Sequence, residues 1–334
     1  MMCIRASVAV TLTGVLLASC TGEKTRTLGS VERFDPALDA IIAADALPEI
    51  LGEGYEWSEG PVWIETEHML LFSDIPNNAV MKWTEKNGVE SYLKPSGFTG
   101  SDFTGKEPGA NGLLIDADGK LVLCQHGDRR VAVMDASLSD PKPVFKTLAD
   151  RWEGKRLNSP NDAVYDADGD LYFTDPPYGL PRNVDDPAKE IPFQGVYKLK
   201  ADGTVKLLTD TIPRPNGIGI SPDGKTLYVA NSEGSDARWS AYDIAGDSLV
   251  NARIFFRTPW KEGEKGAPDG LKVDRNGNIF ATGPGGVWIL DPSGKPLGRI
   301  HIPEATANCA LSPDGKYLFT TSDMYLLRVA LKGY

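Results

Sequence analysis

The stretch PNGIGISPDGKTLYVAN, residues 215–231, decides the fold. Apolar and polar residues alternate on both sides of Asp223-Gly224, as in two β-strands joined by a tight turn. The same kind of phrase, opened by a small polar or acidic residue, occurs at five further places: EGPVWIETEHMLLFSD (59–74), ANGLLIDADGKLVLC (110–124), PNDAVYDADGDLYFTD (160–175), PDGLKVDRNGNIFATG (268–283) and NCALSPDGKYLFTTS (308–322). The chain is therefore expected to repeat one β-hairpin.

The spacing of the turns predicts the architecture. The turn residues His68, Gly119, Gly169, Gly224, Gly277 and Gly315 are separated by 51, 50, 55, 53 and 38 residues. This spacing leaves room for two more strands per unit, such as residues 195–200 and 204–209 after the third copy. Six four-stranded units predict an all-β, six-bladed β-propeller. Because the last unit is short, residues 48–51 are expected to supply its outer strand and close the ring.

Composition and charge narrow the function classes. The 334 residues are 41% hydrophobic and 24% charged, enough for a sizeable core. A net charge of −11 disfavours a nucleic-acid-binding surface. No G-x-S-x-G, H-E-x-x-H, P-loop or helix-opening G-x-G-x-x-G motif occurs. The sequence therefore does not support hydrolysis by a catalytic triad or redox chemistry with a dinucleotide cofactor.

The N-terminus predicts export. Arg5 precedes an uncharged stretch, residues 6–19, that is too short to span a bilayer but suits a signal peptide. Leu-Ala-Ser-Cys at 17–20 resembles the bacterial lipobox. We therefore expect a lipoprotein signal peptide at 1–19, a polar tether at 20–40 after an acylated Cys20, and the propeller at 41–334. The alternative is an ordinary secretory signal with an incidental cysteine.

The predicted lipoprotein signal peptide indicates where the protein is located in the cell. A lipid anchor would hold the protein on a bacterial membrane, facing the periplasm or the exterior, and a monomer is sufficient there.

Cys124 and Cys309 are expected to be buried free thiols, although an oxidising periplasm would also allow them to pair.

Polar residues open the inner strands at nearly constant spacing. Four of them lie 8 residues before their turn glycine, one lies 9 before His68 and one lies 7 before Gly315. Inner strands of a propeller run in one direction around a channel, so these side chains should meet at one mouth. We call them the ring residues: Glu59, Asn111, Asn161, Asn216, Asp269 and Asn308.

The ring residues predict a cation site. Two carboxylates with several amide oxygens form a hard-oxygen donor set that suits Ca²⁺, whereas no thiolate or imidazole cluster favours zinc. Zn²⁺ and Mn²⁺ stay open, since cellular supply also matters. The alternative is that Asn and Asp start these strands merely as turn residues.

The second strand of each hairpin returns to the same mouth. Its end brings His126 and Asp175 near the ring, as candidates for proton transfer or substrate orientation. Alternatively, such a histidine is a hydrogen-bonded structural residue.

Several motifs resemble the gluconolactonase / senescence-marker-protein family over about residues 35–334. They are Glu-Gly-Pro (59–61), LFSDIPNN (71–78), RLNSPND (156–162), YFTDPPYG (172–179), PNGIGISPDGKTLYVA (215–230) and PDGLKVD (268–274). The resemblance implies a six-bladed propeller with one catalytic divalent cation, usually Ca²⁺, and hydrolysis of a sugar lactone.

Residue by residue, the resemblance assigns the metal ligands to Glu59, Asn161, Asn216 and Asp269. Asn111 and Asn161 are expected to contact the substrate. Animal members place a substrate-binding arginine two residues before the Asn of the N-D motif. Here that position is Ser159, which leaves Arg156 as the candidate.

The sequence thus predicts a small-molecule lactonase. The cation would polarise the lactone carbonyl, and Asp269 would act as general base, with Asp175 or His126 sharing the proton transfer. Two alternatives stay open: a non-catalytic Ca²⁺-binding propeller that binds a ligand or protein, and an aryl-esterase or phosphotriesterase using the same site.

Overall fold

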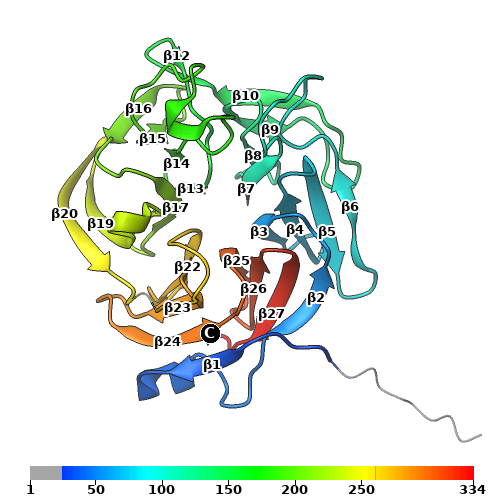
Figure 1. The fold of residues 1–334 in the computed structure, drawn as a ribbon, viewed down its shortest axis with the longest axis vertical. Helices are drawn as coiled ribbons and strands as arrows, with labels where there is room; N and C mark the ends of the chain where they lie inside the picture. Colours follow the sequence, from blue (N-terminus) through cyan, green and yellow to red (C-terminus); the bar gives the residue numbers. More distant parts are fainter. Residues whose placement is uncertain (1–24, 260) are drawn as a thin grey trace, which may run out of the picture.

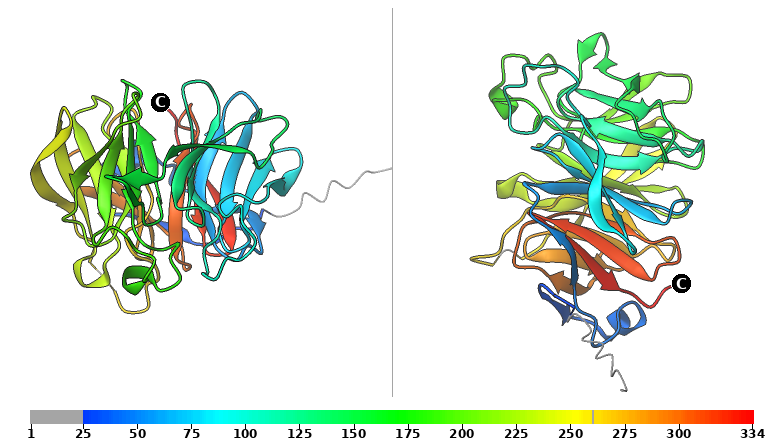
Figure 2. Two further views of the ribbon diagram at one scale, coloured as in Figure 1. Left: turned by 90° about the horizontal axis from the view of Figure 1, so that it is seen from above. Right: turned by 90° about the vertical axis from the view of Figure 1, so that its right-hand side faces the viewer.

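A computed structural model describes residues 25–259 and 261–334. In these residues the strands form six sheets arranged around a central channel, as seen in Figure 1. Figure 2 shows the same ring from two sides. The predicted all-β, six-bladed propeller is confirmed.

The strands of the first four blades, from the channel outwards, are as follows. They are β3 (Ser58–Ile64), β4 (Met69–Asp74), β5 (Ala79–Thr84) and β6 (Gly88–Leu93); β7 (Ala110–Ile115), β8 (Leu121–Gln125), β9 (Arg130–Met134) and β10 (Phe145–Ala149); β13 (Ala163–Tyr165), β14 (Leu171–Asp175), β15 (Gly195–Leu199) and β16 (Val205–Thr209); and β17 (Pro215–Ile220), β18 (Thr226–Asn231), β19 (Arg238–Ala245) and β20 (Ser248–Phe256).

The last two blades recruit strands from the N-terminal segment. The fifth contains β21 (Leu271–Val273), β22 (Ile279–Gly283), β23 (Gly286–Leu290), β24 (Pro296–His301) and β1 (Ser30–Arg33), and the sixth contains β25 (Thr306–Leu311), β26 (Tyr317–Ser322), β27 (Tyr325–Ala330) and β2 (Glu49–Glu53). Outside the blades lie the hairpin β11 (Arg151–Trp152) and β12 (Lys155–Arg156) and the 3₁₀ turns η1 (Pro36–Ala40), η2 (Asn183–Asp185) and η3 (Gly234–Asp236).

The ring is closed as predicted. Strand β2 pairs antiparallel with β27, so that Ile50 lies opposite Leu327. Residues from the two ends of the chain therefore share one sheet, and β2 supplies the outer strand of the sixth blade, where it pairs the edge of β27.

The propeller begins earlier than the predicted boundary between a polar tether at 20–40 and the propeller at 41–334, because residues 30–40 are packed on it. Strand β1 pairs antiparallel with β24 at the rim of the fifth blade, visible at the bottom of Figure 1. Leu38 is fully buried against this blade, and Glu32 pairs with the buried Arg299 guanidinium at 2.8 Å. Apolar side chains spaced along the segment thus fix it to the propeller. The predicted signal peptide and Cys20 lie outside the described residues.

The core consists of apolar layers between neighbouring blades. One such layer joins Phe280 and Val287 of the fifth blade to Cys309 and Leu318 of the sixth. Cys124 and Cys309 are both buried and free, as expected. Among the described residues, no helix has the length and apolar character needed to cross a membrane.

Hydroxyl groups link three of the blades to the inner strand of the next. Ser73 on β4 donates to the Asn111 carbonyl (2.8 Å), Thr174 on β14 to the Asn216 carbonyl (2.7 Å), and Thr282 on β22 to the Ala307 carbonyl (2.8 Å). These bonds fix the backbone at ring residues Asn111 and Asn216 and next to Asn308.

The packing of the N-terminal segment predicts a stability difference between two leucines. Leu38→Ala should lower the free energy of unfolding by about 2–5 kcal/mol, because it leaves a cavity against the fifth blade. The same substitution at Leu47, which is 50% exposed, should change it by less than about 0.5 kcal/mol. Chemical denaturation of both variants measures this, and equal effects would show that the segment is not packed.

Candidate functional site

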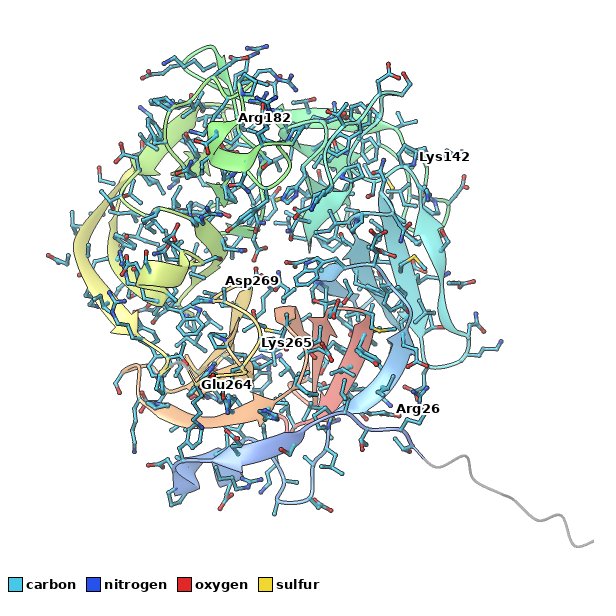
Figure 3. The ribbon with its side chains drawn as sticks, in the orientation of Figure 1. Arg26, Lys142, Arg182, Glu264, Lys265 and Asp269 are labelled. Atoms are coloured by element: carbon cyan, nitrogen blue, oxygen red, sulfur yellow. The ribbon has the colours of Figure 1, made fainter. Side chains whose placement is uncertain are left out.

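The ring residues meet at one mouth of the channel, as the spacing predicts. Five of them line a cavity of about 210 Å³, which we call the inner cavity: Glu59, Asn111, Asn161, Asn216 and Asp269. Three are the second residues of the inner strands β3, β7 and β17, and the other two lie two residues before β13 and β21. Figure 3 shows Asp269 beside the central opening.

Irregular strand starts turn these side chains inwards. The β3–β4, β7–β8 and β17–β18 ladders each shift register just after the ring residue, and such bulges redirect side chains. The following residue is a glycine because the next inner strand lies against it. A Cβ on Gly60 would overlap the Asn111 carbonyl, and one on Gly217 would overlap the Asp269 carbonyl.

The oxygens that face the inner cavity fit a cation. Asn111 Oδ1, Asn161 Oδ1 and Asp269 Oδ1 are buried and have no hydrogen-bond partner. A buried acceptor left unpaired costs about 1–3 kcal/mol, which a bound cation would offset. With Glu59 and Asn216 they form an oxygen donor set suited to Ca²⁺.

The raised pKa values of the two ring carboxylates also indicate a cation site. Burial, reinforced by the Asp162 charge, raises the pKa of Glu59. Burial together with the charges of Glu59, Asp162 and Glu107 raises the pKa of Asp269 well above its usual range. The ionised pair is therefore costly unless a cation sits between them. In the described residues no three or more His, Cys, Asp or Glu side chains cluster as a metal site, so amide oxygens must complete this one.

Asn308, the sixth ring residue, does not line the inner cavity. Its Oδ1 accepts hydrogen bonds from the Cys309 amide (2.9 Å) and from Lys272 Nζ (3.2 Å). The spacing to its turn glycine is one residue shorter than in most copies, and its side chain is used within the channel wall. Asn308 also hydrogen-bonds the Glu59 side chain, so it reaches the ring, but it does not face the inner cavity as the other five do.

Asp175 also lies away from the inner cavity. Its carboxylate is fully buried and accepts from the amides of Asn158 (2.7 Å) and Ser159 (2.8 Å), in the segment that leads to Asn161. Asp74 accepts in the same way from Trp57, two residues before Glu59. Strand-end acids thus hold the loops that carry ring residues, and the contacts of Asp175 are those of a positioning residue rather than a catalytic one.

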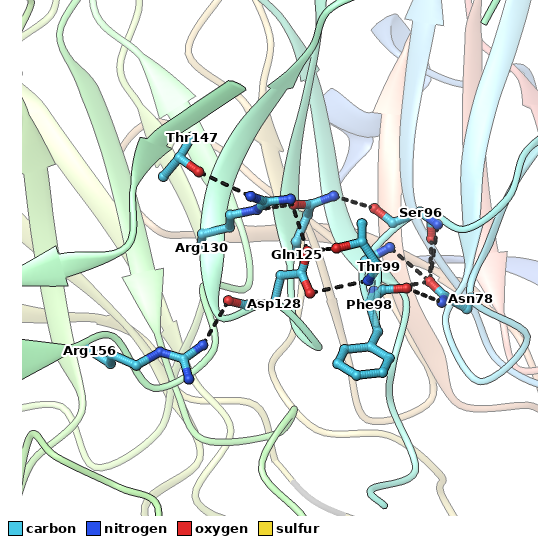
Figure 4. Close-up of polar contacts among 10 residues, drawn as sticks. Asn78, Ser96, Phe98, Thr99, Gln125, Asp128, Arg130, Thr147 and Arg156 are labelled. Atoms are coloured by element: carbon cyan, nitrogen blue, oxygen red, sulfur yellow. Dashed lines mark hydrogen bonds and ion pairs between the residues drawn. The ribbon is translucent and has the colours of Figure 1, made fainter. Parts of the chain in front are cut away.

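Arg156 is not brought to the inner cavity either. Its guanidinium donates to the Asp128 carbonyl at 3.1 Å, as drawn in Figure 4, and it lines a separate pocket of about 420 Å³ with Arg129 and Arg182. The structure therefore gives no support for contact between Arg156 and a substrate held at the ring. The β11–β12 hairpin carries it outwards.

His126 lies next to the ring but behind it. The side chain is fully buried, and its Nε2 is 3.5 Å from the Nδ2 of Asn161. Its Nδ1 is 3.0 Å from Glu107 Oε2, although the two groups are not aligned for a hydrogen bond.

The sequence did not identify four polar or aromatic lining residues. They are Trp57, Glu107, Tyr178 and Ser232. Burial raises the pKa of Tyr178 to about 12, so its hydroxyl stays protonated. Tyr178 follows Asp175 in the sequence Asp-Pro-Pro-Tyr, a turn that returns to the mouth of the channel. This turn in the sequence could have predicted that Tyr178 lies near the ring residues. Glu107 lies in the loop between β6 and β7, where no strand periodicity marks it.

The opposite mouth has different chemistry. A pocket of about 380 Å³ there is lined by the second halves of the same strands, including Val62, Leu113 and Ile218, with Lys272 as its charged residue. The carboxylates are thus gathered at one end of the channel.

Comparison with known proteins places the chain among lactonase relatives. A sequence model of the family described as SMP-30/Gluconolactonase/LRE-like region matches residues 57–324. A gluconolactonase of Zymomonas mobilis is 37% identical over 97% of this chain and 92% of its own length. The solved structure of a gluconolactonase from Xanthomonas campestris has 30% identity and a TM-score of 0.78, covering 93% of this chain and 99% of its own.

A more distant solved structure shares the fold. It is a calcium-binding protein, regucalcin, from Agrobacterium tumefaciens, with 20% identity and a TM-score of 0.65, covering 85% of this chain and 94% of its own.

Asp175 should make stability depend on pH. Burial, opposed by the Asn158 and Ser159 amides, raises its pKa to about 7, whereas an unfolded aspartate loses its proton near about 3.9. Between these values the folded state binds more protons, so this group lowers the free energy of unfolding as pH rises. The wild-type value minus that of Asp175→Asn should therefore fall between about pH 4 and pH 7 in denaturant titrations. A constant difference would contradict the raised pKa.

Proposed function

The chain belongs to the SMP-30/gluconolactonase/LRE-like family, and from this premise we propose that it is a metal-dependent lactonase that opens a sugar lactone, such as gluconolactone, to the aldonic acid. The observation that carries the proposal is the set of unpaired buried oxygens facing a cavity of about 210 Å³. The gluconolactonases of Zymomonas mobilis and Xanthomonas campestris, similar over nearly the whole chain, support the substrate class.

The cation is proposed to be Ca²⁺, held by Glu59, Asn161, Asn216 and Asp269. When bound, it would supply Lewis-acid polarisation of the lactone carbonyl. Zn²⁺ is less suited, since the donor set contains only oxygen, whereas Mn²⁺ also accepts such a set and is the alternative cation. Asn216 is already oriented for this role, because its Nδ2 donates to Ser232 Oγ at 3.0 Å and leaves Oδ1 for the cation.

The other lining residues would bind and orient the sugar. The protonated Tyr178 hydroxyl and the Asn111 amide can pair with ring hydroxyls, which specifies a polyhydroxylated ligand. Trp57 lines both the inner cavity and a wider opening of about 760 Å³ that we call the outer cleft, and its indole can cover one face of the ring. The product is an aldonate anion, whose release the net charge of −11 favours.

The open access distinguishes this proposal from its rivals. A structural cation would have closed coordination, whereas the inner cavity continues into the outer cleft through Trp57 and Glu107. This observation favours an enzyme over a non-catalytic Ca²⁺-binding propeller. An aryl-esterase or phosphotriesterase would use the same opening, so a substrate panel must separate these activities.

We also propose that the protein is exported and anchored through an acylated Cys20. The proposal rests on the Leu-Ala-Ser-Cys sequence at residues 17–20. Mass spectrometry of the mature N-terminus would identify a lipid on Cys20, and an unmodified residue beginning elsewhere would contradict it.

Removal of the metal or of one ligand should abolish lactone opening. Proton release from a panel of sugar lactones, aryl esters and organophosphates should be fastest with a sugar lactone, should stop after chelation and should return with Ca²⁺. Glu59→Gln should lower kcat/KM by about 10²-fold or more, about 3 kcal/mol of transition-state stabilisation.

Glu67→Gln is the matched control, because Glu67 is an exposed glutamate in the turn of the same blade. It should keep wild-type kcat/KM. Full activity after chelation, or equal activity of the two variants, would contradict the role of the cation.

A further inference from the structure

Glu107 is a third acid at the inner cavity, and its position differs from those of Glu59 and Asp269. It comes from the loop between β6 and β7 rather than from the ring, and it lines both the inner cavity and the outer cleft. Its side chain is 33% exposed, whereas Glu59 is 2% exposed. Glu107 is therefore the carboxylate that incoming water and substrate can reach at the cavity wall.

The buried His126 connects Glu107 to the ring. Nδ1 lies 3.0 Å from Glu107 Oε2, which makes the carboxylate its neighbouring acceptor, although the pair is not aligned as a hydrogen bond in this structure. Nε2 lies 3.5 Å from Asn161 Nδ2. A proton on Nδ1 would point towards the carboxylate and leave Nε2 to accept from the Asn161 amide, so this tautomer suits both neighbours.

This arrangement also fixes which atom of Asn161 faces the cavity. When Nδ2 donates to His126, Oδ1 is turned towards the cation site, where it has no other partner. One imidazole thus orients a metal ligand on one side and a free carboxylate on the other.

The loop that carries Glu107 is held at its base. Figure 4 shows Thr99 bonded to the Asp128 carboxylate through its amide (3.1 Å) and hydroxyl (2.7 Å), while the Phe98 carbonyl accepts from Asn78 Nδ2 at 2.8 Å. Arg130 pairs with the same carboxylate at 2.9 Å. These bonds join the loop to the first two blades, so Glu107 starts from a defined backbone.

We propose that Glu107 is the general base of the lactonase reaction and that His126 is its positioning residue. The proposal rests on the lactonase function proposed above. Glu107 takes a proton from water as the water oxygen bonds to the carbonyl carbon. The bond between that carbon and the ring oxygen then breaks, and the same proton passes to the departing ring oxygen. The elements of water are thus added across one ester bond, and no other reactant is needed.

The division of roles among the acids follows from basicity. A carboxylate bound to a cation is a poor base, so Asp269 acts as a ligand, in place of the base role that its sequence position suggested. Glu107 lines the same cavity without being one of the four proposed ligands, so its carboxylate is left to take the proton.

The test compares Glu107→Gln with Glu56→Gln, since Glu56 is an exposed glutamate lining the outer cleft but not the inner cavity. We expect Glu107→Gln to lower kcat by about 10²–10⁴-fold, the usual contribution of a placed base. Calorimetric titration with Ca²⁺ should give the wild-type affinity. Glu56→Gln should keep wild-type kcat, and Glu107→Asp should recover part of the lost rate.

The outcomes separate the two proposals. If wild-type protein opens lactones and Glu107→Gln turns over equally fast, the base assignment is overturned while the lactonase function stands. Loss of Ca²⁺ binding in Glu107→Gln would also overturn it, because Glu107 would then be a ligand. If the wild-type protein opens no lactone, both proposals fail together.

His126 is tested through two readouts. His126→Phe removes both ring nitrogens, and it should lower kcat and weaken Ca²⁺ binding by about 10–100-fold while keeping a cooperative thermal transition. His126→Asn can still donate from the Nδ1 side, so it should recover kcat relative to His126→Phe without recovering Ca²⁺ affinity. Wild-type kcat and affinity in both variants would overturn the positioning role.

Discussion

The close approach of neighbouring inner strands around the channel is the constraint on which the site depends. Gly60 and Gly217 allow one backbone to lie directly against the next, where any Cβ would overlap a carbonyl. Hydroxyls from second strands bond some of the inner-strand carbonyls, as Ser73 does with Asn111 and Thr174 does with Asn216. The side chains before the glycines have only the channel to enter, and oxygens accumulate there without enough donors to pair them.

That excess of oxygen explains the electrostatics and the proposed chemistry together. Burial and mutual repulsion make the carboxyls of Glu59 and Asp269 hard to ionise, and a single cation relieves both. Outside this layer, strand-end groups such as Asp175 hold the entering loops, and the loop between β6 and β7 adds Glu107. The acid that holds a loop, the acids proposed to bind the cation and the acid that solvent can reach therefore lie at different positions around the channel.

Periodicity made the propeller and most of the ring predictable, because each hairpin repeats the same offset from polar residue to turn. Asn308 does not line the inner cavity, and in its copy the offset is one residue shorter than in most others. The place of Asp175 behind the cavity could not be predicted, because a strand-end acid has the same sequence position whether it binds a loop amide or a substrate. Glu107 could not be found, since its place depends on how a loop without periodicity folds back over the channel, and β1 has no repeat to reveal it.

A crystal structure of the protein grown with Ca²⁺, with an anomalous difference map, tests the central claim most directly. We expect one peak at the mouth of the channel, about 2.3–2.6 Å from oxygens of Glu59, Asn161, Asn216 and Asp269, with a coordination position open to the outer cleft. An empty mouth at saturating Ca²⁺, or an ion bound elsewhere in the channel, would contradict it.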